Sequence, residues 1–248
     1  MPTKYYRITS VVFLVFVWHY LAIFLSDPLL PTPWQILQSL QFHIYDGELV
    51  FHLGATLRRV IIAFFIAMFL GVIFGILMGA YKKIDESLDF VLIIGLNIPV
   101  IVTIMICYIW IGLNDTSAIV AVVLNKVPVI IVMIREGARA VDAKLMQIAK
   151  VYHLPPTRAL FRLYLPQLYP YIMASARSSL SLIWKIVLTV ELLGRSDGVG
   201  FALTMFFQHF DITSILAYSF AFIFVILLVE FCILIPLEKH TNRWRDNA

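Results

Sequence analysis

Charge is scarce in this sequence. Only 14% of its 248 residues are charged and 61% are hydrophobic, compared with about 25% and about 45–50% in a soluble domain. This composition excludes an ordinary soluble protein, and with a mean hydropathy of +0.91 it predicts an integral membrane protein. The net charge of +4 comes from residues beside apolar runs, so membrane topology explains it and no nucleic-acid partner is expected.

Cysteine and catalytic groups are also scarce. The two cysteines, Cys107 and Cys232, lie inside apolar stretches, where a thiol usually packs as a small hydrophobic group, so we expect no disulfide framework and no metal site. The six histidines are scattered, so no catalytic residue is predicted and a membrane-embedded enzyme is disfavoured. The phosphate-binding pattern Gly-x-x-x-x-Gly-Lys-Ser/Thr is missing, so this chain is expected to carry no ATP, Mg²⁺ or other cofactor of its own.

Long apolar runs, in contrast, are abundant. A bilayer core about 30 Å thick needs about 20 mainly apolar residues per helix. Six segments qualify: 8–25, 57–80, 89–112, 117–135, 168–193 and 212–237. The first lacks a cleavage site and is too long for a signal peptide, so we expect it to remain as a helix. The sequence predicts an all-α polytopic membrane protein with about six transmembrane helices, divided into an N-terminal segment 1–29 and a core 30–245.

The placement of Lys and Arg predicts the orientation of the spans. These residues gather near the N-terminus, after the second span, in the long segment 136–166 and in the C-terminal tail, whereas none occurs between Ser26 and His52. Positive charge is retained on the cytoplasmic side, so both termini are expected to be cytoplasmic, in the inner (plasma) membrane of a bacterial cell. Arg58 and Arg59 run against this trend and are expected to snorkel.

One face of the second span carries a small residue at every fourth position. These residues are Ala63, Ala67, Gly71, Gly75 and Gly79. Small side chains let two helices approach closely in lipid. The stripe is interpreted either as a static packing seam or as the lining of a moving interface.

Prolines interrupt three of the predicted spans. Pro99 lies in the third, Pro128 in the fourth and Pro236 in the sixth. Each proline removes a backbone hydrogen bond, so these spans are expected to be kinked.

The segment 136–166 is too polar to cross the bilayer. Its first part has apolar residues at three- and four-residue steps, which predicts an amphipathic helix that breaks at the sequence HLPP. Pro156 suits the first turn of a second short helix, expected to end before Pro166. Such a pair of helices is either an interfacial linker resting on lipid or a docking element for a cytoplasmic partner.

The sequence QIAKVYHLPPTRALFRLYLP within this segment resembles the cytoplasmic signature of permease subunits of binding-protein-dependent ABC importers. That signature is Glu-Ala-Ala, three residues, Gly, nine residues, Ile-x-Leu-Pro. The matching positions here are Gln147, Ile148 and Ala149, then His153, then Leu163, Leu165 and Pro166. His153 replaces the glycine, and since His enters the left-handed backbone region more readily than most residues, the turn is expected to survive.

The resemblance extends over about residues 30–245 and points to the nitrate, taurine and aliphatic-sulfonate branch of the family. LLPTPWQILQSL is similar to an external Leu-Pro-x-Pro segment of that branch, and NIPVIVTIMICYIWIGLND to its proline-containing third helix. The remaining matches are Arg177, Trp184, Glu191, Gly198 and Gly200.

The resemblance implies a type I ABC importer permease fold. It also implies an assembly of two copies of this chain, two cytoplasmic ATPase subunits that bind ATP and Mg²⁺, and an external solute-binding protein. The helices of segment 136–166, including Leu160, would dock into the ATPase. The implied solute is a small organic or inorganic anion such as a sulfonate or nitrate. An uncharged or cationic vitamin precursor is an alternative solute, and a secondary transporter or channel is an alternative class, although no repeat relates the two halves.

Charged residues within the predicted spans are expected to be paired or to face water, because a charge at the bilayer centre costs about 2.5–3.5 kcal/mol. We hypothesise that Lys126 and Lys185 add positive potential to a translocation path for an anion; alternatively, they neutralise Glu191 and Glu230 or snorkel. Glu191 matches a family position near the outer gate and could also form a structural ion pair. The candidate path residues are Lys126, Arg177, Trp184, Lys185 and Glu191.

Overall fold

The computed structural model describes residues 2–236, and within them the chain forms helices joined by short loops. The helices, in chain order, are α1 Pro2–Leu25, α2 Pro33–Tyr45, α3 Leu49–Ala80, α4 Lys82–Asn97, α5 Val100–Ile111, α6 Asp115–Arg139, α7 Ala143–Val151, α8 Pro156–Ala159, the π-helix η1 Leu160–Tyr164, α9 Leu165–Gly194, α10 Val199–Gln208, α11 Ile212–Val229 and the π-helix η2 Glu230–Leu234. The prediction of an all-α membrane protein is confirmed.

Among the residues that the structure describes, three helical segments are long and apolar enough to cross a membrane: Leu49–Ala80, Asp115–Arg139 and Ile212–Cys232. They correspond to the predicted second, fourth and sixth spans, and the predicted end of the sixth, residue 237, lies outside the described residues. The first span corresponds to the shorter apolar helix Thr9–Leu25. The fifth corresponds to α9, which is 30 residues long but carries Arg177, Lys185 and Glu191.

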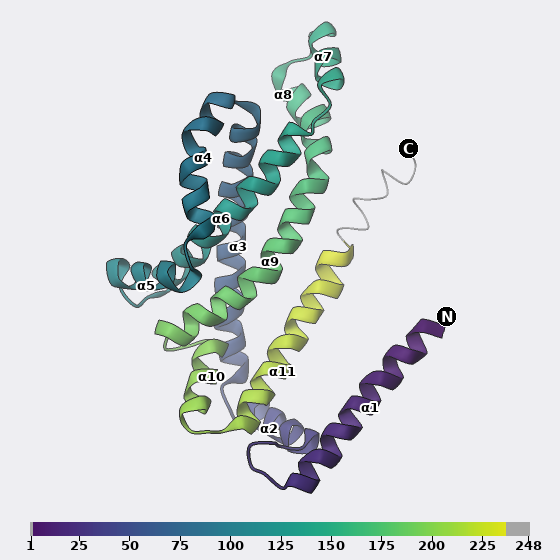
Figure 1. The fold of residues 1–248 in the computed structure, drawn as a ribbon, viewed down its shortest axis with the longest axis vertical. Helices are drawn as coiled ribbons and strands as arrows, with labels where there is room; N and C mark the ends of the chain where they lie inside the picture. The colour runs from purple at the N-terminus through teal and green to yellow at the C-terminus, as the bar shows by residue number, and fades with distance from the viewer. Residues whose placement is uncertain (1, 237–248) are drawn as a thin grey trace.

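The predicted third span differs most from expectation. It is a pair of helices, α4 and α5, bent by 99°, and α5 projects sideways from the bundle (Figure 1). Pro99 is the N-cap residue of the second helix, and Ile98 before it is extended, as residues preceding proline usually are. The Tyr108 hydroxyl donates to the Val190 carbonyl at 2.7 Å, which fastens α5 to α9. By contrast, Pro128 lies inside the continuous helix α6.

The stripe of small residues on α3 lies against α6. A Cβ at Gly75 would come within 2.6 Å of the Ile134 side chain, and Cβ atoms at Gly71 and Gly79 would overlap Ile130 and Ala138. Ala63 and Ala67 are fully buried in the same core. Helices α3 and α6 therefore pack closely along most of α3, which is the geometry that small residues allow in lipid.

Two helices were not predicted from the sequence. Helix α2 begins with a capping box, in which the Thr32 hydroxyl accepts from the Gln35 amide and the Gln35 side chain accepts from the Thr32 amide. Helix α10 follows a glycine-containing turn after α9. Helix α3 also begins at Leu49 rather than at residue 57. These elements gather at one end of the molecule, around the lower end of α11 in Figure 1.

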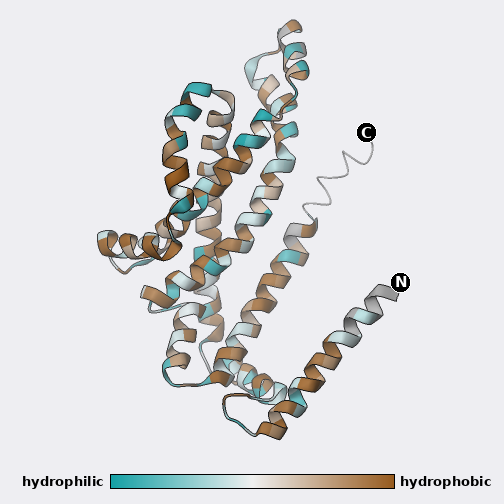
Figure 2. Ribbon diagram, in the orientation of Figure 1, coloured by the Kyte–Doolittle hydropathy of each residue, from teal (hydrophilic) through white to brown (hydrophobic). Residues whose placement is uncertain are grey.

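The opposite end of the molecule carries α7, α8 and the start of α4 (Figure 1). Polar residues cluster on these segments, while apolar residues dominate the helices between the two ends (Figure 2). Arg135 on α6 donates to Asp85 at 3.1 Å and to Asp89 at 2.7 Å on α4. Helix α1 stands apart from the other helices and approaches them at its C-terminal end (Figure 1).

Candidate functional site

The segment expected to couple to an ATPase, residues 136–166, forms a helix, a sharp turn and a second helix beyond the apolar part of the bundle. We call it the coupling loop. Helix α7 ends at Val151, and His153 follows with a φ of 51°, in the left-handed region. The Leu154 amide donates to the Ala149 carbonyl at 2.9 Å, which is the closing bond of a Schellman motif with His153 at its glycine position.

The sequence predicted that the second helix of the coupling loop ends before Pro166, and this prediction is wrong. Helix α8 passes through the π-helix η1 directly into α9, so that the chain is helical from Pro156 to Gly194. A proline ring clashes with the carbonyl four residues earlier in a regular helix. The wider π turn before Pro166 relieves that clash, and the loop therefore continues into α9 without a break in the helix.

The coupling loop exposes large apolar side chains. Tyr152 is 75% exposed and Phe161 67% exposed, while Leu160 is partly exposed and Ala149 is buried. Of the other predicted coupling residues, Gln147 and Pro166 are exposed, and Leu163 and Leu165 are half-buried.

Beneath this surface a cavity of about 730 Å³ separates the coupling loop from the end of α3. Its walls include Leu77 and Tyr81 on one side and Leu160 and Tyr164 on the other. Burial raises the pKa of the Tyr164 phenol. The coupling loop therefore rests on α3 through a loosely filled contact.

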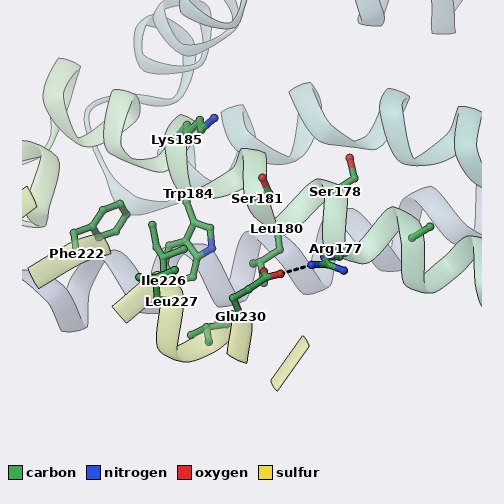
Figure 3. A pocket seen from close by; sticks show the side chains of 12 residues that line it. Arg177, Ser178, Leu180, Ser181, Trp184, Lys185, Phe222, Ile226, Leu227 and Glu230 are labelled. Carbon is green, nitrogen blue, oxygen red and sulfur yellow. Dashed lines mark hydrogen bonds and ion pairs between the residues drawn. The ribbon is translucent and has the colours of Figure 1, made fainter. Parts of the chain in front are cut away.

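A second cavity, of about 710 Å³, opens between α9 and α11 at the level of the spans. We call it the α9–α11 cavity. Ser178, Ser181 and Lys185 lie on the open side of α9, and Arg177 and Trp184 point toward α11 (Figure 3). The first three recur at three- and four-residue steps and are exposed, so α9 presents a polar face within a membrane-spanning bundle.

The far wall of the α9–α11 cavity carries one charged group among the described residues, Glu230. Its Oε1 accepts from Arg177 Nη2 at 2.7 Å (Figure 3). Trp184 packs edge-on against Phe222 of α11, with ring centroids 5.7 Å apart. Three of the predicted path residues, Arg177, Trp184 and Lys185, therefore meet at this cavity.

Glu191 lies elsewhere, in a buried ionic cluster. Arg59 Nη1 donates to Glu191 Oε1 at 2.8 Å, and Arg59 also binds Asp115 at 2.7 Å and Asp197. Arg195 contributes a further contact to Asp115 at 3.1 Å. The cluster joins α3, α6, α9 and the loop before α10, and the expectation that Arg59 snorkels is wrong because its side chain is 1% exposed.

The turn before α10 closes over the Glu191 carboxylate. Oε2 of Glu191 accepts from the Gly200 amide and from the Thr56 hydroxyl, each at 2.9 Å. Gly198 has a φ of 105°, and a Cβ there would overlap the Glu191 carboxyl group. The Gly-x-Gly run thus has a physical reason. Only glycine fits both the backbone conformation and the space at position 198, and a Cβ at Gly200 would overlap the Leu188 carbonyl.

Lys126 is buried on α6, 4% exposed, and does not line the α9–α11 cavity. Among the described residues it forms no hydrogen bond or ion pair. The alternative in which Lys126 and Lys185 neutralise Glu191 and Glu230 is wrong, because those carboxylates pair with arginines instead.

Several residues of these sites were not singled out from the sequence. Ser178 and Ser181 line the cavity, and Thr56, Asp115 and Asp197 complete the ionic cluster. The serines could have been found from their helical spacing to Lys185. The cluster has no sequence signal, since its partners are far apart along the chain.

Comparison with known proteins agrees with these features. The family model described as the inner membrane component of binding-protein-dependent transport systems matches residues 67–245. The aliphatic sulfonates transport permease protein SsuC of Bacillus subtilis is 27% identical over 90% of this chain and 80% of its own length. SsuC of Escherichia coli is 31% identical, over 71% and 67%. The taurine transport system permease protein TauC of Escherichia coli is 26% identical, over 97% and 89%.

The fold is similar to that of two solved ABC transporters. The inward-facing MetNI methionine transporter matches with a TM-score of 0.68 and 17% identity, over 78% of this chain and 95% of that chain. An amino acid ABC transporter matches with a TM-score of 0.63 and 19% identity, over 81% and 97%. These likenesses support the type I importer fold, and the chain belongs to the family of inner-membrane permease components of binding-protein-dependent ABC transport systems.

Proposed function

We propose that this permease works as two identical copies, coupled to cytoplasmic ATPase subunits, and passes a small anion such as a sulfonate along the polar face of α9. An external solute-binding protein delivers the anion. The ATPase subunits bind ATP and Mg²⁺, and no chemistry occurs on this chain. The observation that carries the proposal is the polar, exposed face of α9 formed by Ser178, Ser181 and Lys185.

The polar face of α9 is the reason for proposing a second copy of the chain. Arg and Lys are costly in hydrocarbon, and ionisable residues within membrane spans almost always face a bundle interior or water. Lys185 is exposed in the single chain. A second copy placed against α9 would enclose the α9–α11 cavity and remove Lys185 from lipid, leaving a water-filled path between the copies.

An anionic solute follows from the charges on the α9–α11 cavity. Its described lining has two cations, Arg177 and Lys185, against one carboxylate, Glu230. Hydroxyl groups of Ser178 and Ser181 add hydrogen-bond donors, and Trp184 adds an apolar wall. Such a lining suits a small organic anion with a short apolar part, which is the chemistry of the aliphatic sulfonates for which SsuC is named. Taurine, for which TauC is named, has the same sulfonate group.

The coupling loop is the proposed contact with the ATPase. Exposed Tyr152 and Phe161 would be buried in that interface, as aromatic anchors typically are. Because η1 continues into α9, movement of the loop would pass directly to the helix that lines the path. We propose that the loop and both termini lie on the cytoplasmic side of the inner membrane, which the clustering of Lys and Arg in these segments of the sequence supports.

Affinity purification from native membranes, with mass spectrometry of stoichiometric partners, tests the docking. We expect an ATPase subunit to copurify, and a Tyr152→Ala, Phe161→Ala variant to lose it. The matched control is Phe65→Ala, Phe69→Ala, since both residues are similarly exposed but lie on α3. If the chain purifies alone yet moves solute in liposomes without ATP, a secondary transporter explains it better.

Transport in proteoliposomes tests the solute. We expect Lys185→Gln to lower ATP-driven sulfonate uptake about tenfold or more, whereas Lys185→Arg keeps the charge and most of the uptake. Lys126→Gln should leave uptake near wild type, because Lys126 does not line the cavity. Unchanged uptake in Lys185→Gln, together with uptake of an uncharged or cationic vitamin precursor, would overturn the anion part of the proposal.

A further inference from the structure

The α9–α11 cavity contains an acidic group that an anion path would not need. Glu230 is the one charged residue in the apolar sequence from Ile212 to Leu234. An ionisable residue inside a membrane span is costly and marks a functional site more often than not. Glu230 is also the residue at which α11 changes into the π-helix η2, and such local changes of helix type are frequent at functional sites.

The position of Glu230 shows that it pairs with Arg177 and not with Lys185. Its carboxylate accepts from Arg177 at 2.7 Å across the cavity, whereas Lys185 points to the open side of α9 (Figure 3). Neither Arg177 nor Glu230 is deeply buried, since their side chains are 46% and 27% exposed. The pair is therefore accessible from the cavity and contributes to the field that an entering solute meets.

We infer that Glu230 sets the charge selectivity of the path. By neutralising Arg177, it leaves the described lining of each copy with a single net positive charge, carried by Lys185. Each copy then contributes one net positive charge to the path instead of two, which lowers the attraction for doubly charged anions more than for singly charged ones such as alkanesulfonates. This inference rests on the proposed function, because it takes the solute to be an anion.

The pair has a simpler explanation as a latch that holds α11 against α9. A latch and a charge filter differ when both partners are removed together. Replacing only Glu230 adds one positive charge to the cavity, and replacing both Arg177 and Glu230 restores the original net charge while abolishing the ion pair. If Glu230 acts as a charge filter, charge selectivity should change in the single variant and return to the wild-type value in the double variant. If the pair acts only as a latch, both variants lose the ion pair and should behave alike.

The experiment measures binding of ethanesulfonate and 1,2-ethanedisulfonate by calorimetry, using the full importer complex in nanodiscs of uncharged lipid. Wild type is expected to prefer the monoanion. Glu230→Gln is expected to shift the ratio of the two Kd values toward the dianion by about tenfold, and Arg177→Gln, Glu230→Gln is expected to return it to the wild-type ratio. Glu86→Gln is the matched control, since it changes the net charge equally at an exposed site outside the cavity.

The outcomes separate this inference from the proposed function. If ethanesulfonate binds but the ratio is the same in wild type and Glu230→Gln, the charge-filter role is wrong and the anion path stands. If the ratio shifts equally in Glu86→Gln, the effect is global and the role is again wrong. If neither anion binds while the complex still hydrolyses ATP with its loaded binding protein, the anion proposal fails, and this inference fails with it.

Discussion

Arg59 and Glu191 form an ion pair at 2.8 Å that is almost completely enclosed, with side chains 1% and 0% exposed. Two charges in such a place are stable only because each is fully bonded, Arg59 to three carboxylates and Glu191 to the Gly200 amide and the Thr56 hydroxyl. The pair holds α3 to α9 at the point where α10 begins. It is a structural element of the permease rather than part of the lining of the α9–α11 cavity.

Removing one partner of this pair should strongly destabilise the protein. Arg59→Ala leaves Glu191 buried without its counter-ion, and breaking such a pair typically costs about 3–5 kcal/mol. Arg58→Ala removes the neighbouring arginine, which is 59% exposed and pairs with Oδ2 of Asp115. This substitution should lower the free energy of unfolding by less than about 1 kcal/mol. Thermal unfolding in detergent, followed by size-exclusion chromatography, compares the two variants. Equal melting temperatures would contradict the structural role of Arg59.

The sequence predicted the spans well where few charged residues interrupt the apolar runs, as in α3, α6 and α11. It predicted a break at Pro99 but not the 99° bend, because the direction of α5 depends on contacts with distant segments, which include its packing against α6 and the bond from Tyr108 to Val190. Arg59 was misread for the same reason. Its partners Asp115 and Glu191 lie 56 and 132 residues away, and no local pattern links them.

The coupling loop was predicted in more detail than the cavity. The left-handed backbone at His153 follows from a residue-by-residue match to a signature with glycine there, and the structure has it. The continuous helix through Pro166 was missed, because the π turn that accommodates the proline has no sequence pattern. The pairing of Glu230 with Arg177 was also not predicted, since it depends on how α9 and α11 face each other.

Gly198 should be irreplaceable by alanine. Its φ of 105° is rarely adopted by other residues, and an added Cβ would overlap the Glu191 carboxyl group. Gly198→Ala is therefore expected to lower the free energy of unfolding by about 1–3 kcal/mol. Gly54→Ala is the control. It lies within helix α3 and has no heavy atom within 4 Å of the added Cβ, so alanine there should stabilise by up to about 1 kcal/mol. Yields of monodisperse protein after heating distinguish the two, and a Gly198→Ala variant as stable as Gly54→Ala would refute the assignment.

Acid should loosen α2 from α11. His43 Nε2 lies 2.9 Å from the Ser214 hydroxyl, and burial holds the pKa of His43 below its ordinary value of 6.5, although Asp211 partly opposes the shift. A proton therefore binds more readily when α2 is undocked. The docked state keeps its full stability above pH 6.5 and loses it as the pH falls below that value.

Hydrogen exchange of α2 amides measures this loosening. We expect exchange, corrected for its intrinsic pH dependence, to rise several-fold between pH 7.5 and 5. In His43→Gln, which keeps a polar side chain but does not titrate, the rise should disappear. A rise of the same size in both proteins would assign the effect to another group.

Changes in the coupling loop should separate backbone conformation from side-chain contact. His153→Gly removes the cost of placing a side chain at a φ of 51°, so docking of the ATPase should be preserved. Leu160→Gly deletes a partly exposed apolar side chain and adds a flexible residue at the start of η1, so docking should weaken, by about 1 kcal/mol from the backbone alone. Leu29→Gly, in an exposed loop between α1 and α2, is the control for loss of a leucine away from the interface. Quantitative copurification of the ATPase compares the three variants, and equal recovery with His153→Gly and Leu160→Gly would show that Leu160 takes no part in the contact.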